Sequence, residues 1–190
     1  MGCALARVMA VSQRELLAVP GSRRQDIIDG VAEGYPELEA IAEAFEDDDL
    51  PIDLVEAVAH IIDGKEWLPE CGSLYLYAVE AICWHLGGWF TLPFPFPGEE
   101  ALDAFLAPQG CPVRLVDLGS CGSPLAIPEP GYPPSIGWWR ADQVAEATQF
   151  FSRIRDAGLE ARMRSGIAAV RRWLKRATEL RDGCLVGTWY

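Results

Sequence analysis

The sequence predicts an α+β fold: a mostly helical single domain over residues 1–190, with a small β-sheet formed by N-terminal, central and C-terminal strands. Two observations predict this fold. Apolar residues recur at helical spacing through most of the chain. Short segments near residues 4–11, 113–118 and 184–190 have strand composition instead. A single domain follows because no flexible linker or internal repeat divides the chain.

The composition excludes several classes of protein. Half of the residues are hydrophobic and the mean hydropathy is +0.08, which excludes a disordered chain. The net charge of −12 and the pI near 4.5 repel phosphate backbones and anionic lipid, so we expect no nucleic-acid partner. No apolar stretch is long enough to span a bilayer and the N-terminus does not match a secretory signal. We therefore expect a soluble cytoplasmic protein without a membrane partner.

The first half of the chain predicts one strand and four helices. Residues 4–11 form the strand. Ser12 followed by Glu15, and Ser22 followed by Gln25, both match the capping box that begins a helix. Two further helices are expected from apolar residues at helical spacing, over residues 36–45 and 52–63.

The centre of the chain predicts a buried helix followed by loops. Residues 73–87 are apolar almost all round, which indicates a central helix that is buried on most sides. Residues 89–97 interleave aromatic residues with three prolines and are expected to be extended or a loop. Alternation predicts a strand at 113–118, and a loop rich in Gly, Ser and Pro follows over 119–134.

The last third predicts two terminal helices and a closing strand. Residues 136–139 are a further short strand candidate. Asp142 is the expected cap of one helix, and a longer helix follows Gly158. The closing strand at 184–190 is expected to pair with residues 4–11 or with 113–118.

Charge is concentrated in two segments. Residues 33–70 contain thirteen acidic residues and one Lys, so the net charge of this segment is −12, the same as that of the whole chain. It is either an ordinary solvated surface or a face that docks a basic protein partner. The partner-binding candidates are Glu43, Glu46, Asp47, Asp48 and Asp49. In the basic segment 153–181, a helical stripe could bind a phosphate or carboxylate through Arg164, Arg171 and Lys175.

Few residues are candidates for catalysis or for binding a metal or cofactor. The two histidines and the absence of a C-x-x-C pair argue against a metal site, and no motif indicates a cofactor. Glu80 and His85 are weak catalytic candidates because both lie on the apolar helix at 73–87. Cys121, in a Gly-Ser-Cys-Gly-Ser loop, is a weak nucleophile candidate. The alternative for His85 is a hydrogen-bonded histidine of the core. The alternative for Cys121 is an ordinary turn that contains glycine.

Tryptophans adjoin several of the loops. Trp84, Trp89 and Trp138 are candidates to line a ligand pocket between helix 73–87 and the Pro/Trp-rich loops. The alternative is that they close a core beneath long loops.

Four segments carry a resemblance to a known family. They are residues 16–22 (LLAVPGS), 77–87 (YAVEAICWHLG), 124–128 leading to 136–138, and 185–187. Together they resemble small uncharacterised bacterial proteins with a domain of unknown function, distantly YfbM-like. The resemblance implies a bacterial cytosolic α+β protein and transfers no catalytic or binding residue.

Two functions from different classes follow from these observations. The first is a non-enzymatic inhibitor or immunity-type protein that binds a basic protein through residues 33–70. The second is a small-molecule-binding protein or small enzyme that uses the pocket beside helix 73–87. The sequence favours the first, and it leaves the oligomeric state and the occurrence of any reaction open.

Overall fold

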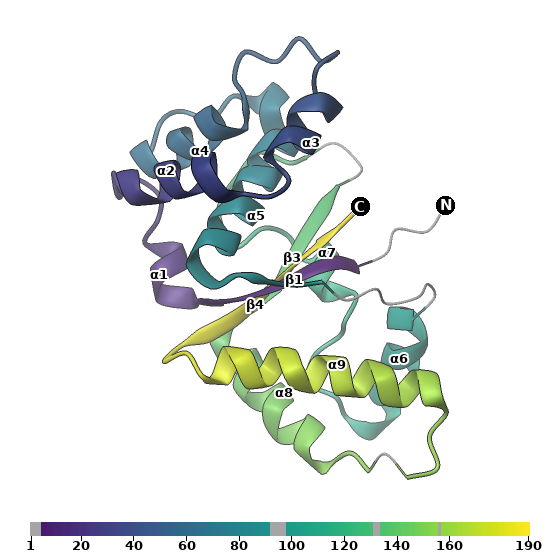
Figure 1. Ribbon diagram of the computed structural model, residues 1–190. Helices are drawn as coiled ribbons and strands as arrows, with labels where there is room; N and C mark the ends of the chain where they lie inside the picture. The colour runs from purple at the N-terminus through teal and green to yellow at the C-terminus, as the bar shows by residue number, and fades with distance from the viewer. Residues whose placement is uncertain (1–4, 92–97, 131–133, 156) are drawn as a thin grey trace.

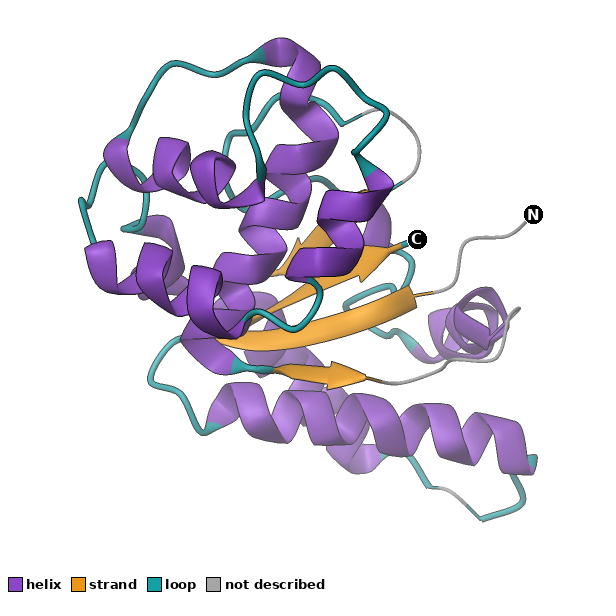
Figure 2. Ribbon diagram, turned by 45° about the horizontal axis from the view of Figure 1, so that its top comes forward, coloured by secondary structure: helices purple, strands orange, loops and turns teal. Residues whose placement is uncertain are grey.

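The computed structural model describes residues 5–91, 98–130, 134–155 and 157–190. A four-stranded antiparallel sheet with strand order β2-β1-β4-β3 runs through the middle of these residues, and Figure 2 shows helices on both of its faces. The strands are β1 (Leu5–Ser12), β2 (Trp89–Thr91), β3 (Ser135–Trp139) and β4 (Gly183–Trp189). The predicted α+β fold, with N-terminal, central and C-terminal strands, is confirmed.

The helices form two layers (Figure 1). One layer follows β1 in the chain and contains α1 (Gln13–Leu17), α2 (Gln25–Gly34), α3 (Leu38–Ala44), α4 (Leu54–Asp63), the 3₁₀ turn η1 (Pro69–Cys71) and α5 (Gly72–Gly87). The other contains α6 (Gly98–Leu106), the turn η2 (Ala107–Gln109), α8 (Ala141–Arg153) and α9 (Ala161–Thr178). The short helix α7 (Asp117–Ser120) packs against β3 and β4.

The central strands are apolar on both faces because both faces are covered. Along β1, Met9 and Val11 belong to the core beneath α2, α4 and α5, whereas Val8 and Ala10 belong to the core beneath α8 and α9. Successive side chains of a strand point to opposite faces, so an uninterrupted apolar run suits a strand buried on both sides. The pairing of β1 with β4 confirms the first of the two partners expected for the closing strand.

Helix α5 is the central helix that the sequence predicts. Ten of its residues are buried. Its C-terminal end lies directly on β1, because a Cβ atom at Gly87 would come within 2.1 Å of the Ala10 carbonyl oxygen. Only glycine permits this close approach of the helix to the strand.

The strand predicted at 113–118 is wrong. The backbone amides of Leu115 and Val116 donate to the Asp103 carboxylate, at 2.7 and 3.1 Å, instead of to a neighbouring strand. Residue 117 then begins α7, whose backbone lies against paired glycines of β3 and β4: a Cβ at Gly137 would sit 1.9 Å from the Asp117 carbonyl oxygen. The central strand is the shorter candidate at 136–139, now part of β3.

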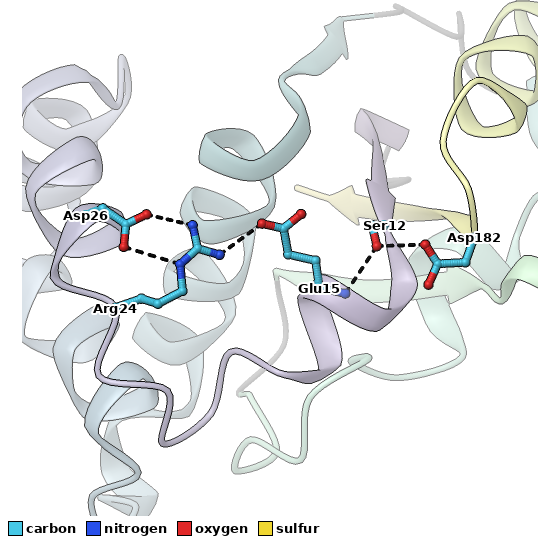
Figure 3. A network of polar contacts seen from close by, with 5 residues as sticks. All are labelled: Ser12, Glu15, Arg24, Asp26 and Asp182. Atoms are coloured by element: carbon cyan, nitrogen blue, oxygen red, sulfur yellow. Dashed lines mark hydrogen bonds and ion pairs between the residues drawn. The ribbon is translucent and has the colours of Figure 1, made fainter.

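One of the predicted helix caps is confirmed and two are wrong. The Ser12 hydroxyl accepts from the Glu15 amide at 3.2 Å and begins α1 (Figure 3). Ser22 does not cap α2, because Arg23, at a left-handed φ of 57°, turns the chain and the N-cap residue is Arg24. Helix α8 begins before Asp142, since the Arg140 amide donates to the Gln143 side chain and makes Arg140 the N-cap residue.

Candidate functional site

Glu80 is a completely buried carboxylate in the middle of α5. It accepts hydrogen bonds from the Tyr35 hydroxyl at 2.8 Å, from the Tyr190 hydroxyl and from the Arg7 guanidinium. Its partners come from the end of α2, from β1 and from the residue after β4. Arg7 also donates to the Tyr190 oxygen at 3.2 Å and pairs with Glu37 at 2.9 Å, which extends the network to the surface.

Electrostatics keep the two phenols and the guanidinium of this network each in one protonation state. Burial and the nearby Glu80 carboxylate raise the pKa of Tyr35 and of Tyr190 well above the ordinary tyrosine value. Burial lowers the pKa of Arg7, but the charge and hydrogen bond of Glu80 together with the nearby Tyr190 and Tyr35 outweigh it, and the net shift is upward. The phenols therefore stay neutral and the guanidinium stays charged at neutral pH.

The arrangement around Glu80 favours a structural role over a catalytic one. A general base needs an oxygen that faces its substrate. Three donors instead surround the Glu80 carboxylate, and the Tyr190 ring stacks on Tyr77 with centroids 5.7 Å apart. The network fastens β1, α5 and the end of β4 together. Sequence reasoning singled out Glu80 but missed Arg7, Tyr35 and Tyr190, because nothing local to those residues signals a shared partner.

His85 lies near the C-terminal end of α5, where it is half-buried against α2. A Cβ at Gly30 would come within 2.3 Å of its imidazole Nδ1, so the missing side chain of Gly30 makes room for the ring. In the described part of the chain, no hydrogen bond joins His85 to Glu80 or to Cys121. Glu80 and Cys121 each make their own hydrogen bonds to other residues.

Cys121 lies at the outer edge of β3. Its Sγ donates to the Trp138 carbonyl oxygen and accepts from the Trp138 amide, both at 3.3 Å. The Gly122 amide donates to the Ile136 carbonyl oxygen at 3.1 Å. The loop thus satisfies backbone groups that an edge strand would otherwise expose. It follows the helix α7 and not the strand that the nucleophile hypothesis assumed.

The three tryptophan candidates lie in different surroundings. Trp84 packs edge-to-face on Tyr35, with ring centroids 5.6 Å apart. Trp138 is half-buried in β3 and packs against the core beneath α5. Trp89 begins β2, and its side chain lies outside the described residues, as do residues 92–97 of the Pro-rich loop. A pocket between helix 73–87 and these loops therefore stays a prediction.

The acidic segment 33–70 runs from the end of α2 through α3 and α4 to η1, in the helical layer that also contains α5. Twelve of its thirteen acidic residues are exposed, and Glu37 is half-buried. Among the described residues, two of the thirteen have an ion-pair partner: Glu37 pairs with Arg7, and Asp63 lies 3.7 Å from Lys65. The five partner-binding candidates, Glu43, Glu46, Asp47, Asp48 and Asp49, are exposed at the end of α3 and just after it.

An apolar groove opens within this acidic surface. It has a volume of about 440 Å³ and lies between α3, α4 and the residues that join them. Its floor contains the buried side chains of Ile41, Leu54 and Leu74. Three acidic residues also line it: Asp48, Asp53 and Glu56. Sequence reasoning found the acidic residues but missed the groove, because its apolar residues look like ordinary helix stripes.

A family model described as a domain of unknown function (DUF7691) matches residues 1–190. The chain belongs to this family. No curated protein and no solved structure matched it. The match confirms the predicted domain of unknown function over the whole chain and assigns no activity to it.

The anion-binding candidates of this DUF7691 chain lie along α9. Arg171 donates to the carbonyl oxygens of Phe151, at 3.0 and 3.1 Å, and of Ile154, at 2.7 Å, at the end of α8. Arg164 donates to the Leu159 carbonyl oxygen. Lys175 is exposed and lines, with Arg171, a hollow of about 310 Å³. Two of the three cations thus bind backbone carbonyl groups, and anion binding stays a prediction.

The described part of this DUF7691 chain has neither a candidate metal site nor a candidate membrane span. Among the described residues, no group of three or more His, Cys, Asp or Glu side chains is placed to hold a metal ion. Within the same residues, no helix has the length and apolar character needed to cross a membrane.

Proposed function

We propose that this protein is a non-enzymatic binding module of the bacterial cytoplasm that covers a basic protein partner, as an inhibitor or immunity-type protein does. The face that binds is the surface of residues 33–70. One observation carries the proposal: twelve exposed acidic residues lie on one helical layer, and eleven of the thirteen in the segment have no ion-pair partner among the described residues. Such a field attracts a basic partner, speeds its encounter and rejects acidic competitors.

The bacterial origin, the cytoplasmic location and the distant YfbM-like relation rest on the resemblance of the four sequence segments. The alternative function, a small-molecule-binding protein or small enzyme, places Glu80, His85 and possibly Cys121 as polar groups in a pocket between helix 73–87 and the Pro/Trp-rich loops. Their separate contacts give it no support.

The experiment starts with a pull-down from the native cell extract at low and at moderate salt. The retained protein is identified and purified, and its dissociation constant is measured for wild type and for the triple variant Glu43→Lys, Asp47→Lys, Asp48→Lys. We expect a basic partner, release by salt, and a loss of at least about tenfold in affinity for the variant, since screening and charge reversal both remove the attraction.

A matched control separates the face from the net charge. The variant Glu100→Lys, Glu129→Lys, Glu146→Lys changes the charge by the same amount at exposed positions outside residues 33–70. It should keep most of the affinity. An empty eluate, or binding that survives reversal of Glu43, Asp47 and Asp48, would overturn the proposed function.

A further inference from the structure

The groove between α3 and α4 has the features of a site for apolar side chains. Beyond its buried floor, large apolar residues that are only partly buried form its walls: Leu38, Phe45, Leu50 and Ile52. Its volume of about 440 Å³ falls within the range of about 300–1,000 Å³ typical of clefts that bind ligands. A hollow of this size, lined by aliphatic and aromatic groups, gains free energy when apolar groups of a partner fill it.

The negative charge around the groove favours an occupant with positive charge. Asp53 and Glu56 are held in place by a capping box: the Glu56 amide donates to Asp53 at 2.8 Å and the Asp53 amide donates to Glu56 at 3.0 Å. Asp48 is exposed on the segment that leads out of α3. Among the described residues, no Lys or Arg lines the groove. An occupant therefore needs an apolar side flanked by cations.

The groove walls also select the shape of the occupant. The groove is lined by helices α3 and α4, by Leu74 near the start of α5, and by the joining residues. Helices use their backbone donors and acceptors internally, so the helical part of this lining offers no edge on which an extended peptide could add a strand. A helix brings its own backbone hydrogen bonds and needs only side-chain contacts, which is how amphipathic helices bind apolar grooves.

We propose that this groove takes the apolar face of a basic amphipathic helix of the partner protein, with Lys or Arg side chains beside that face meeting Asp48, Asp53 and Glu56. This inference rests on the proposed function and deepens it, because it names the kind of segment that the partner presents. The acidic surface attracts the partner, and the groove determines which part of it docks.

Three synthetic peptides of about 18 residues, or five helical turns, serve as probes. The first is a helix of Leu and Lys with one apolar face. The second has every Leu replaced by Ser and the same charge. The third has every Lys replaced by Glu. Fluorescence anisotropy of labelled peptide gives the dissociation constant for each.

Two variants on α3 form a matched pair. Ala42 and Ala40 are both exposed, but Ala42 lines the groove and Ala40 does not. Ala42→Trp fills the groove, whereas Ala40→Trp adds the same side chain elsewhere on the same helix. Circular dichroism checks that both variants fold. We expect the Leu/Lys peptide to bind wild type, to lose at least about tenfold in affinity with Ala42→Trp, and to change less than about twofold with Ala40→Trp.

Several outcomes overturn the inference. One is equal affinity for the Leu/Lys and Ser/Lys peptides, another is equal binding of the Leu/Glu peptide, and a third is the same effect of both Trp substitutions. The proposed function fails separately, in the pull-down. The purified partner distinguishes the two proposals. If its binding is lost on reversal of Glu43, Asp47 and Asp48 but is unaffected by Ala42→Trp, the proposed function holds and the groove inference alone is overturned.

Discussion

At the scale of single residues, Glu80 shows how an apolar helix tolerates a charge. A carboxylate removed from water is costly unless donors and an opposite charge replace the water. Glu80 is fully buried, and Arg7, Tyr35 and Tyr190 provide three donors and one positive charge. Because all of these partners are distant in sequence, the residue that looked like a catalytic candidate holds the tertiary structure together.

Replacing Glu80 by Gln should strongly destabilise the protein. The substitution keeps the size of the side chain but removes its charge, so the mostly buried Arg7, 16% exposed, loses its inner partner. Breaking a buried ion pair costs about 3–5 kcal/mol, and the amide keeps part of the hydrogen bonding, so we expect a loss of about 3 kcal/mol. Urea denaturation followed by circular dichroism measures the free energy of unfolding.

Glu37→Gln is the control for this prediction. Glu37 pairs with the same guanidinium but is 35% exposed, so water screens the pair and its loss should cost less than about 1 kcal/mol. If the two substitutions lowered the free energy of unfolding equally, Glu80 would not hold the network together.

At the scale of elements, one polar network fixes where the first helix begins. The Ser12 hydroxyl accepts from the Glu15 amide and donates to Asp182 at 2.7 Å, and Asp182 also accepts from the Arg14 amide at 2.9 Å. The Ser12 hydroxyl helps to hold the pKa of Asp182 below its ordinary value. Figure 3 shows how this network ties the start of α1 to the turn before β4, and how Arg24 joins Glu15 to Asp26.

The two serines that the sequence marks as helix caps should behave differently. Ser12→Ala removes a cap and a link to Asp182, so it should cost about 1–2 kcal/mol. Ser22→Ala should cost less than about 0.5 kcal/mol, because the buried Ser22 hydroxyl has no hydrogen-bond partner among the described residues and removing it leaves no group unpaired. Thermal and urea denaturation of both variants provide the measurement. Equal losses would contradict the placement of the caps.

At the scale of the whole molecule, two helical layers bury titratable groups on the central strands of the sheet. Cys184 of β4 is fully buried, and this burial raises the pKa of its thiol from an ordinary value near 9 to about 12. The pKa values of Tyr35 and Tyr190 are raised by burial as well. A raised pKa means that the folded state favours the neutral form. This contribution to stability is complete below pH 9 and is lost as the pH rises towards 12.

Alkaline pH should therefore destabilise the protein, and part of the effect should belong to Cys184. In the unfolded chain the thiol ionises from about pH 9, whereas in the folded chain it stays neutral at pH 10. Between pH 7 and pH 10 this difference amounts to about 1.4 kcal/mol, since one pKa unit corresponds to that free energy.

Cys184→Ala tests this expectation. The variant lacks the thiol, so its free energy of unfolding should fall by about 1.4 kcal/mol less than that of wild type over the same pH range. Urea denaturation at pH 7, 8, 9 and 10 gives both curves. Parallel curves for wild type and variant would show that the buried thiol does not contribute.

The sequence by itself determined the features that depend on neighbouring residues. The nearly continuous apolar character of residues 73–87 located α5, the composition of residues 4–11 and 184–190 located two paired strands, and the acidic segment 33–70 was evident because its charges are close in sequence. These signals are local: an apolar run of helical length, a strand-like composition and a run of like charge need no knowledge of distant segments.

Only the tertiary structure decided which distant residues meet. The Asp103 side chain takes the amides of residues 115 and 116, so a segment with strand-like alternation forms no strand. Glu80 receives partners from three other segments, and the apolar groove exists because α3, α4 and the start of α5 converge. These outcomes depend on how complementary surfaces pack after the chain has folded back on itself, and sequence spacing contains no record of that packing.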